Sequence, residues 1–208
     1  MERNTDKTRV PRQERSRETR RRLIAAGERL FSQKGFHHTT SKEIATEAGV
    51  AIGSFYAYFV DKKALFIDVL KRHSEQVFDS ISTVRLDDIG NTDPRGLLTD
   101  LIKAIIVAHE ISPGFHRELT VMVHSDPEIR TVMDGWQEEV TARICETLAL
   151  WKDRIRTKDL EAAAVLIYET MEAAVHRIKL YGLDMKEERL VGELSDMLSR
   201  YLFDKAEG

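Results

Sequence analysis

The chain has a single cysteine, Cys145, in 208 residues, so it cannot form an intrachain disulfide or hold a cysteine-based zinc cluster. Its longest uninterrupted apolar run, residues 162–168, is far shorter than the roughly 18 residues that a membrane-spanning helix needs. No apolar stretch follows the basic residues near the N-terminus, so we expect no secretory leader. These absences exclude membrane-spanning helices, disulfide-stapled secreted modules and zinc fingers, and they predict a cytoplasmic protein.

Glycine and proline are also scarce, with 11 and 4 residues. Apolar residues recur every three to four positions almost throughout, which predicts an all-α fold of about nine helices. A loop is expected at residues 85–93. The expected helices cover about residues 14–34, 40–48, 52–59, 62–82, 94–109, 113–124, 127–151, 157–180 and 186–203.

Several helix starts carry a capping signal. Three segments have the capping-box pattern, in which a short polar side chain and a glutamate three residues later satisfy each other's backbone N–H groups: Thr40–Glu43, Ser125–Glu128 and Asp184–Glu187. Asp61 and Thr157 are expected to cap the helices that follow them.

Charge is distributed unevenly along the chain. The first 63 residues hold 14 Lys or Arg against 8 Asp or Glu, a balance of +6, whereas the remainder has a balance of −9. A basic segment joined to an acidic one suggests that the first part meets a polyanion. A run of solvent-exposed charges explains the same counts. The spacing of the small and apolar residues therefore has to distinguish the two interpretations.

Residues 40–59 have the spacing of a helix-turn-helix. This motif needs a small residue where the two helices touch, a glycine at the turn and apolar anchors on both sides. Ala45 is the small residue, Gly49 follows four positions later, and Val50 is placed to plug the turn. The expected anchors are Ile44, Ala48, Phe55 and Phe59. An ordinary helical hairpin is the alternative.

These residues resemble the DNA-binding domain of the TetR (tetracycline repressor) family. The resemblance covers about residues 18–67 and rests on Ile24–Phe36, Thr39–Ala45, Ala48–Val50, Gly53–Phe59 and Lys62–Phe66. It implies a homodimeric transcriptional regulator with a helix-turn-helix DNA-binding domain (14–62) and a helical domain for ligand binding and dimerisation (63–208). Residues 1–13 lack apolar periodicity and are expected to form a flexible basic arm.

The resemblance also implies which residues contact DNA. Ala51, Ile52, Gly53 and Ser54 stand where the family reads bases, and Tyr56, Tyr58 and Lys62 stand where it contacts phosphate. Thr40, Ser41 and Lys42, at the start of the preceding helix, complete the expected set, with Lys42 reaching a base edge or a phosphate. Ile52 and Gly53 cannot make the bidentate contacts that specify guanine or adenine, so the operator sequence is not predictable.

The C-terminal segment offers ligand-binding candidates. Tyr168, Glu172 and His176 recur at i, i+4 spacing on one helix face, and Phe115, Met122 and Trp136 are candidates for an apolar pocket wall. A solvated or subunit-interface stripe and ordinary core aromatics are the alternatives. His109, His116 and His124 are close in sequence, but we expect scattered histidines and no metal site. No catalytic constellation or phosphate-binding glycine loop is present, so we expect neither an enzyme nor a cofactor.

The sequence therefore predicts a repressor that an apolar or amphipathic small molecule releases from an inverted-repeat operator. The alternative is a DNA-binding regulator whose C-terminal domain docks a protein partner. A cavity of several hundred Å3 favours the first and a solid domain the second. We expect the dimer to form through the last two long helices, about 157–180 and 186–203. The apolar residues proposed for this interface are Ala162, Val165, Leu166, Met171, Val175, Leu190, Leu194, Met197, Leu198 and Tyr201.

Overall fold

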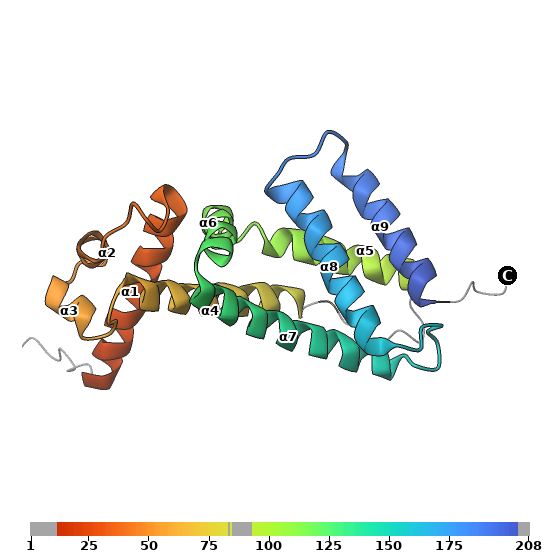
Figure 1. The fold of residues 1–208 in the computed structure, drawn as a ribbon, viewed down its shortest axis with the longest axis horizontal. Coiled ribbons are helices and arrows are strands. Elements are labelled where there is room, and N and C mark those ends of the chain that lie inside the picture. The colour runs from red at the N-terminus through yellow and green to blue at the C-terminus, as the bar shows by residue number, and fades with distance from the viewer. Residues whose placement is uncertain (1–11, 83, 85–92, 204–208) are drawn as a thin grey trace, which may run out of the picture. The chain divides into compact units, whose positions relative to one another are not determined.

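A computed structural model describes residues 12–82, 84 and 93–203 of the chain (Figure 1). The expected basic arm lies outside these residues except for its last two positions, which belong to the first helix. The expected loop at 85–93 likewise lies outside them except for Asp93. The described residues form nine α-helices and no strand, which confirms the all-α prediction.

The helices follow one another along the chain. Their bounds are α1 (Arg12–Lys34), α2 (Ser41–Glu47), α3 (Ile52–Tyr56), α4 (Lys62–Ile81), α5 (Pro94–Ala108), α6 (Pro113–Ser125), α7 (Pro127–Leu150), α8 (Leu160–Lys179) and α9 (Glu187–Leu202). None of these helices is long and apolar enough to cross a membrane.

The chain divides into two compact units, residues 1–70 and 71–208. We call the first the head and the second the body. The domain boundary expected after residue 62 coincides with the start of α4, whereas the compact packing of the head continues to Leu70. Helix α4 therefore contributes its first half to the head and its second half to the body.

The head has a core of aromatic and aliphatic side chains from α1 to α4. The Phe31 and Phe66 rings lie 5.1 Å apart between centroids, and Phe36 meets Phe66 edge-on at 5.4 Å. Gly27 allows α1 and α4 to approach closely, because a Cβ atom at this position would collide with Leu65. These contacts fix α1 against α4, and α2 and α3 pack onto this pair.

The body is a helical bundle in which α9 packs against α5 and α8, and α7 packs against α8 and α6 (Figure 1). Its core consists mainly of aliphatic side chains, closed at one end by Trp151 and Phe203. The core includes Leu98, Ile102, Ile106, Leu148, Ala163, Ala164, Ile167, Met171, Val175, Val191, Leu194, Leu198 and Leu202.

Two of the helix starts that the capping residues predicted are confirmed. The Thr40 hydroxyl accepts from the Glu43 N–H at 3.2 Å while the Glu43 carboxylate accepts from the Thr40 N–H at 2.8 Å, which completes the capping box. The Asp61 carboxylate accepts from the Ala64 N–H at 2.8 Å at the start of α4.

Two of the expected capping boxes are wrong. Asp126 rather than Ser125 caps α7, because Pro127 takes the first helical position and Ser125 ends α6 with its hydroxyl bonded to the Val121 carbonyl. Helix α9 begins after Lys186, which makes no side-chain cap.

Two further boundaries differ from the predictions. Asp159 rather than Thr157 caps α8, since its carboxylate accepts from the Ala162 N–H at 3.0 Å. Helix α3 ends at Tyr56, three residues before the expected end, yet Phe59 remains buried in the head core.

Candidate functional sites in the head and the body

The turn between α2 and α3 is fixed by backbone geometry and by a side chain from α1. Gly49 has a φ of +64°, in the left-handed region that favours glycine, and the Val50 N–H donates to the Ala45 carbonyl at 2.9 Å. Nη2 of Arg22 donates to the carbonyl oxygens of Ala48 and Gly49. The turn therefore depends on α1 as well as on its own residues.

The apolar anchors predicted for the helix-turn-helix are all buried. Their exposed fractions, and that of the small residue Ala45, are at most 5%: Ile44, Ala48, Phe55 and Phe59. The pair of helices is therefore packed onto the head core by the residues that the spacing indicated, and the prediction of a helix-turn-helix is confirmed.

The start of α3 faces solvent. Ala51, Ile52 and Gly53 are exposed, with 41% of Ile52 accessible, and Ser54 is half-buried. A Cβ atom on Gly53 would meet nothing within 4 Å. These residues contribute little to the core, so they are free to contact another molecule.

The start of α2 is partly used for its own cap. Thr40 is exposed, but its backbone and hydroxyl are engaged with Glu43, while Ser41 is half-buried and Lys42 is exposed. The hydrogen bond from Lys34, together with those from Thr40, lowers the pKa of Glu43 to about 2. Of this group, the side chain of Lys42 is the one that reaches into solvent as a cation.

The two tyrosines after α3 differ in their surroundings. Tyr56 is 57% exposed and lies edge-on to Phe55. The Tyr58 hydroxyl is 3.1 Å from the Ser16 hydroxyl on α1 and donates to it. Tyr58 thus ties α1 to the end of the helix-turn-helix.

The ammonium group of Lys62 is bound by other residues of the head. This ammonium donates to the carbonyl oxygens of Phe36 at 2.7 Å and Thr39 at 2.8 Å, and it lies 4.3 Å from the centroid of the Phe36 ring. Burial lowers the pKa of this ammonium. A phosphate would have to compete with these three partners.

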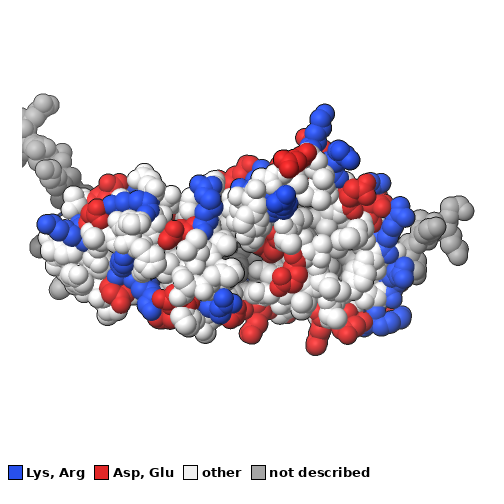
Figure 2. Space-filling view, turned by 45° about the horizontal axis from the view of Figure 1, so that its top comes forward, with Lys and Arg blue, Asp and Glu red and all other residues white. Residues whose placement is uncertain are grey.

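Charge in the head remains positive within the described residues. Residues 12–70 hold 11 Lys or Arg against 7 Asp or Glu. On the face drawn in Figure 2, Lys and Arg side chains lie among Asp and Glu side chains rather than in a field of one sign. The excess of positive charge is thus spread over the surface and partly paired, as by Arg20 with Asp68 and Arg29 with Glu47.

The body contains a cavity of about 630 Å3 with a largely apolar lining. Trp136, Tyr168 and Glu172, three of the predicted ligand-binding residues, line it. Phe115 and Met122 are fully buried and are not among the lining residues. The cavity wall is completed by residues that the sequence did not single out for a pocket, among them Val77, Phe78, Ile105, Met133, Val140 and Met171, the last of which was expected at the dimer interface.

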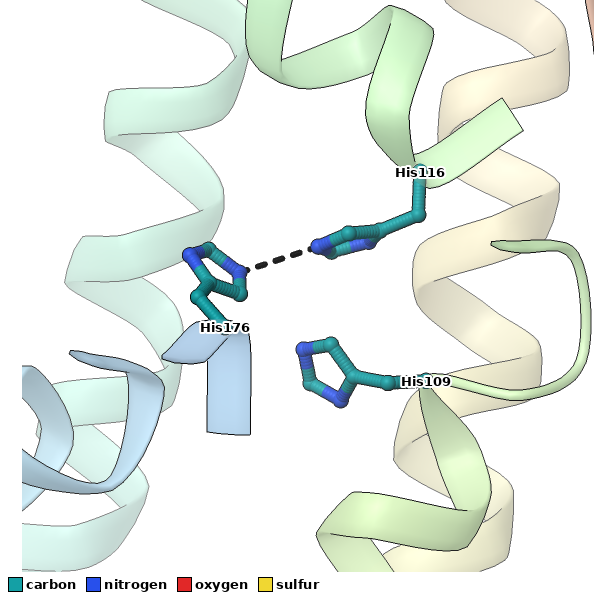
Figure 3. Close-up of side chains that lie close together, drawn as sticks. All are labelled: His109, His116 and His176. Atoms are coloured by element: carbon teal, nitrogen blue, oxygen red, sulfur yellow. Dashed lines mark hydrogen bonds between the residues drawn. The ribbon is translucent and has the colours of Figure 1, made fainter. Parts of the chain in front are cut away.

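One part of the cavity wall is polar. The Glu172 carboxylate lies 3.1 Å from Nε2 of His176 and 3.6 Å from Nε2 of His109. Nε2 of His116 is 2.9 Å from Nε2 of His176 (Figure 3). His109, His116 and Glu172 line the cavity, whereas His176 is not among the lining residues. We call His109, His116 and His176 the three-histidine cluster.

These groups shift one another's pKa values. Burial opposes the charge of Glu172, but the hydrogen bonds from His109 and His176 outweigh it and lower the pKa of Glu172. Burial likewise opposes the charge of His109, and Glu172 outweighs it, so the pKa of His109 is raised. Burial, with the charge of His109, lowers the pKa of His116 to about 3, and burial raises the pKa of Tyr168.

The sequence grouped these histidines differently. His124 lies outside the cluster; it is exposed, and Nδ1 is 2.7 Å from the Thr120 carbonyl of its own helix. His73 on α4, which the sequence did not single out, is 3% exposed and lines the cavity next to Phe115. Only the i, i+4 pair of Glu172 and His176 was detectable, because the other contacts are made between helices.

Comparisons with known proteins match both parts of the chain. The family described as bacterial regulatory proteins, tetR family, matches residues 23–69, and the tetracyclin repressor-like C-terminal domain matches residues 93–202. The transcriptional repressor NemR of Escherichia coli (strain K12) is 43% identical over 56 residues, which are 27% of this chain and 28% of that protein. The matched segments span between 28% and 31% of the length of NemR and of the two first curated relatives.

Solved structures share the fold over nearly the whole chain. A TetR-family regulator from Mesorhizobium loti has a TM-score of 0.75 at 22% identity and covers 90% of this chain and 96% of its own. The multidrug binding protein EbrR, solved with imidazole, has a TM-score of 0.71 at 23% identity and covers 95% and 100%. Since the C-terminal family model alone matches more than half of the residues, the chain belongs to the TetR family of bacterial regulatory proteins, a family of DNA-binding transcriptional regulators.

Proposed function

We propose that this protein is a ligand-responsive repressor that binds duplex DNA through the start of α3. The observation that carries the proposal is the exposure of Ala51, Ile52 and Gly53 on a helix whose other side is anchored in the head core by Phe55. The major groove of B-DNA is wide enough to admit an α-helix such as α3. Lys42 and Tyr56, which are exposed nearby in sequence, are proposed to contact the DNA backbone or a base edge. The cytoplasm is the proposed compartment, because DNA is the proposed partner.

The cavity of the body supports a small molecule as the effector. Its volume of about 630 Å3 is within the range of ligand pockets, and its apolar wall is interrupted by a few polar groups such as Glu172 and Tyr168. A body built only to dock a protein partner has no need for such a cavity. We therefore propose an apolar or amphipathic effector. The structure of EbrR with imidazole is an example of a similar fold with a small molecule bound.

We propose a homodimer that uses the exposed faces of α8 and α9. Val165, Leu166 and Met197 are 47%, 53% and 49% exposed, and Ala162 is also exposed. Four residues of the interface expected from the sequence belong instead to the core of their own body: Met171, Val175, Leu194 and Leu198. Leu190 and Tyr201 are half-buried. A two-fold dimer would present two helix-turn-helix motifs, as an inverted-repeat operator requires.

Selection from random duplex DNA tests the proposal. The full chain is incubated with a random library, bound duplexes are sequenced, and the selected sequence is used to screen small molecules for release of DNA. An inverted repeat that a compound releases, with the compound protecting the body in hydrogen exchange, is the expected outcome. Failure to enrich any sequence contradicts DNA recognition, and release without protection of the body contradicts the role of the cavity.

A further inference from the structure

The three-histidine cluster brings ring nitrogens from three helices to one point. His109 caps the C-terminus of α5, His116 lies near the start of α6, and His176 lies in the last turn of α8. One ring nitrogen of each histidine lies within 4.8 Å of the other two. Figure 3 shows the three rings converging. We propose that His109, His116, His176 and Glu172 bind a divalent transition metal ion, with Zn2+ as the expected occupant.

The spacing of the four side chains suits tetrahedral coordination. Zn–N bonds of about 2.0–2.1 Å place neighbouring ligand nitrogens about 3.3 Å apart in a tetrahedron. Nε2 of His176 lies 2.9 Å from Nε2 of His116 and 3.1 Å from Oε2 of Glu172. Nε2 of His109 lies 3.6 Å from the same Glu172 oxygen. These three distances bracket the separation expected between neighbouring ligands of a tetrahedral zinc ion.

The ligand types also suit such an ion. Imidazole nitrogen is a preferred ligand of Zn2+, Co2+, Ni2+ and Cu2+, and a single carboxylate is a common companion. The Glu172 carboxylate supplies the negative charge that a dication needs inside a largely apolar body. Three imidazoles and one carboxylate give a set more suited to a transition metal than to Mg2+ or Ca2+, which prefer oxygen ligands.

An outer hydrogen bond orients one of the ligands. Nδ1 of His109 lies 2.8 Å from the Ile105 carbonyl oxygen, which can only accept, so Nδ1 carries a proton. Nε2 is therefore the nitrogen that gives up its proton when a metal ion binds, and it faces Glu172, so the ion would lie between the two. A backbone carbonyl bonded to the far nitrogen is the arrangement by which metal-binding histidines are commonly fixed.

The cluster is incompletely satisfied by hydrogen bonds among its own members. His116 is 9% exposed, and its Nδ1 has no hydrogen-bond partner among the described residues. Its Nε2 shares one short contact with His176, whose Nε2 also faces Glu172. One proton on His176 cannot serve both neighbours well, whereas a metal ion accepts electron pairs from all of them. The cavity, which His109, His116 and Glu172 line, gives the ion a path of entry.

Titration with Co2+ and Zn2+ tests the proposal. The full chain, first freed of metal with a chelator, is titrated with Co2+ and followed by visible absorption, because tetrahedral Co2+ absorbs far more strongly than octahedral Co2+. We expect one Co2+ per chain with a tetrahedral spectrum that Zn2+ abolishes by displacement. X-ray absorption at the zinc edge of the unmodified protein should show three imidazoles in a four-ligand shell.

Variants locate the site. His176→Ala changes a half-buried ligand, Glu172→Gln keeps the shape of the fourth ligand, and His124→Ala removes an exposed histidine outside the cluster. We expect the first to weaken Zn2+ binding by about a hundredfold and the second by about tenfold or more, with no change in the third. Circular dichroism identifies any variant that fails to fold, and the spectrum and zinc-edge data of the unmodified protein then decide alone.

Three results would overturn the proposal: an octahedral Co2+ spectrum, fewer than three imidazoles at zinc, or equal weakening by His124→Ala and His176→Ala. Because no DNA takes part in these measurements, they succeed or fail independently of the proposed repressor function.

Discussion

Nζ of Lys62 lies 2.8 Å from the carbonyl oxygen of Thr39, so the first residue of α4 is joined to the segment that leads into α2. A second bond to the Phe36 carbonyl and the contact with the Phe36 ring hold the same ammonium. The position of the helix-turn-helix relative to α4 therefore depends on a lysine that the sequence assigned to phosphate contact.

Lys62→Met should destabilise the head. The substitution keeps the aliphatic stem but removes two charge-assisted hydrogen bonds and a cation–π contact, and we expect a loss of about 1–2 kcal/mol after allowing for partial exposure. Urea unfolding followed by circular dichroism measures it. An unchanged unfolding midpoint, combined with a lower salt dependence of DNA binding, would instead support the phosphate contact.

Lys42→Met should weaken DNA binding but leave the stability of the head unchanged. Lys42 is exposed in α2, so we expect unchanged stability, weaker DNA binding and a decrease of about one in the salt slope if its partner is a phosphate. Binding isotherms at several salt concentrations measure this. A changed base preference with an unchanged slope would assign Lys42 to a base edge, and unaltered binding would remove it from the interface.

Gly53→Glu should weaken DNA binding without disturbing the fold. The position is open, so the new side chain fits the free protein, but its carboxylate would face the negatively charged DNA. We expect a loss of affinity of about tenfold or more with an unchanged or higher melting temperature. The matched control is Gly135→Glu, at an exposed and equally open position in α7 of the body. Equal effects of the two substitutions would show that net charge, not the position of α3, is responsible.

Charged residues on the proposed dimer face should separate the protomers. Leu166→Glu combined with Met197→Glu places two carboxylates on the exposed surfaces of α8 and α9, where a dimer would bury them. Sedimentation velocity should show a dimer for the unmodified chain and a shift to monomer for the double variant. Val121→Glu, at a 54% exposed position of α6, is the control. A double variant that sediments like the parent would locate the interface elsewhere.

The capping box of α2 should make the stability of the head depend on pH. The Glu43 pKa is lowered to about 2 in the folded chain, so the carboxylate stabilises the head above its ordinary pKa of about 4.5, and this contribution is lost as the pH falls toward 2. Glu43→Gln should therefore lower the urea midpoint at pH 6, with a smaller difference at pH 3. Glu138→Gln, in the body, controls for loss of one negative charge. A difference that does not change with pH would contradict the assignment.

Local patterns predicted the helices well because apolar spacing and capping chemistry act over a few residues. The box at Thr40 and Glu43 formed as expected because the two carboxylate oxygens of Glu43 serve different partners: Oε2 accepts from the Thr40 N–H, while Oε1 accepts from Lys34. At Ser125 the pattern failed because Pro127 places the helix start one residue later and the Ser125 hydroxyl is already bonded within α6. The pattern of a box does not reveal such competition.

The candidate sites were only partly predictable. Exposure at the start of α3 followed from the helix-turn-helix spacing, since Phe55 and Phe59 had to face the core. In the body, the contact between His116 and His176 depends on how α6 and α8 are placed relative to each other. The spacing of apolar residues along a single helix does not indicate that placement. The hydrogen bonds from Lys62 to the carbonyl oxygens of Phe36 and Thr39 were not predictable either, because they also join residues that are far apart in the sequence.

The residues that shape the head and those exposed at the start of α3 are different residues, although one five-residue helix carries both. Phe55 is buried, while Ala51, Ile52 and Gly53 face solvent with open space around Gly53. Mutations at the three exposed positions are therefore nearly free of folding cost. On the proposed role of α3 in reading DNA, two copies of such a chain would acquire separate operators after a gene duplication by drift at these positions alone, and both would inherit the same core, the same turn and the same cavity in the body.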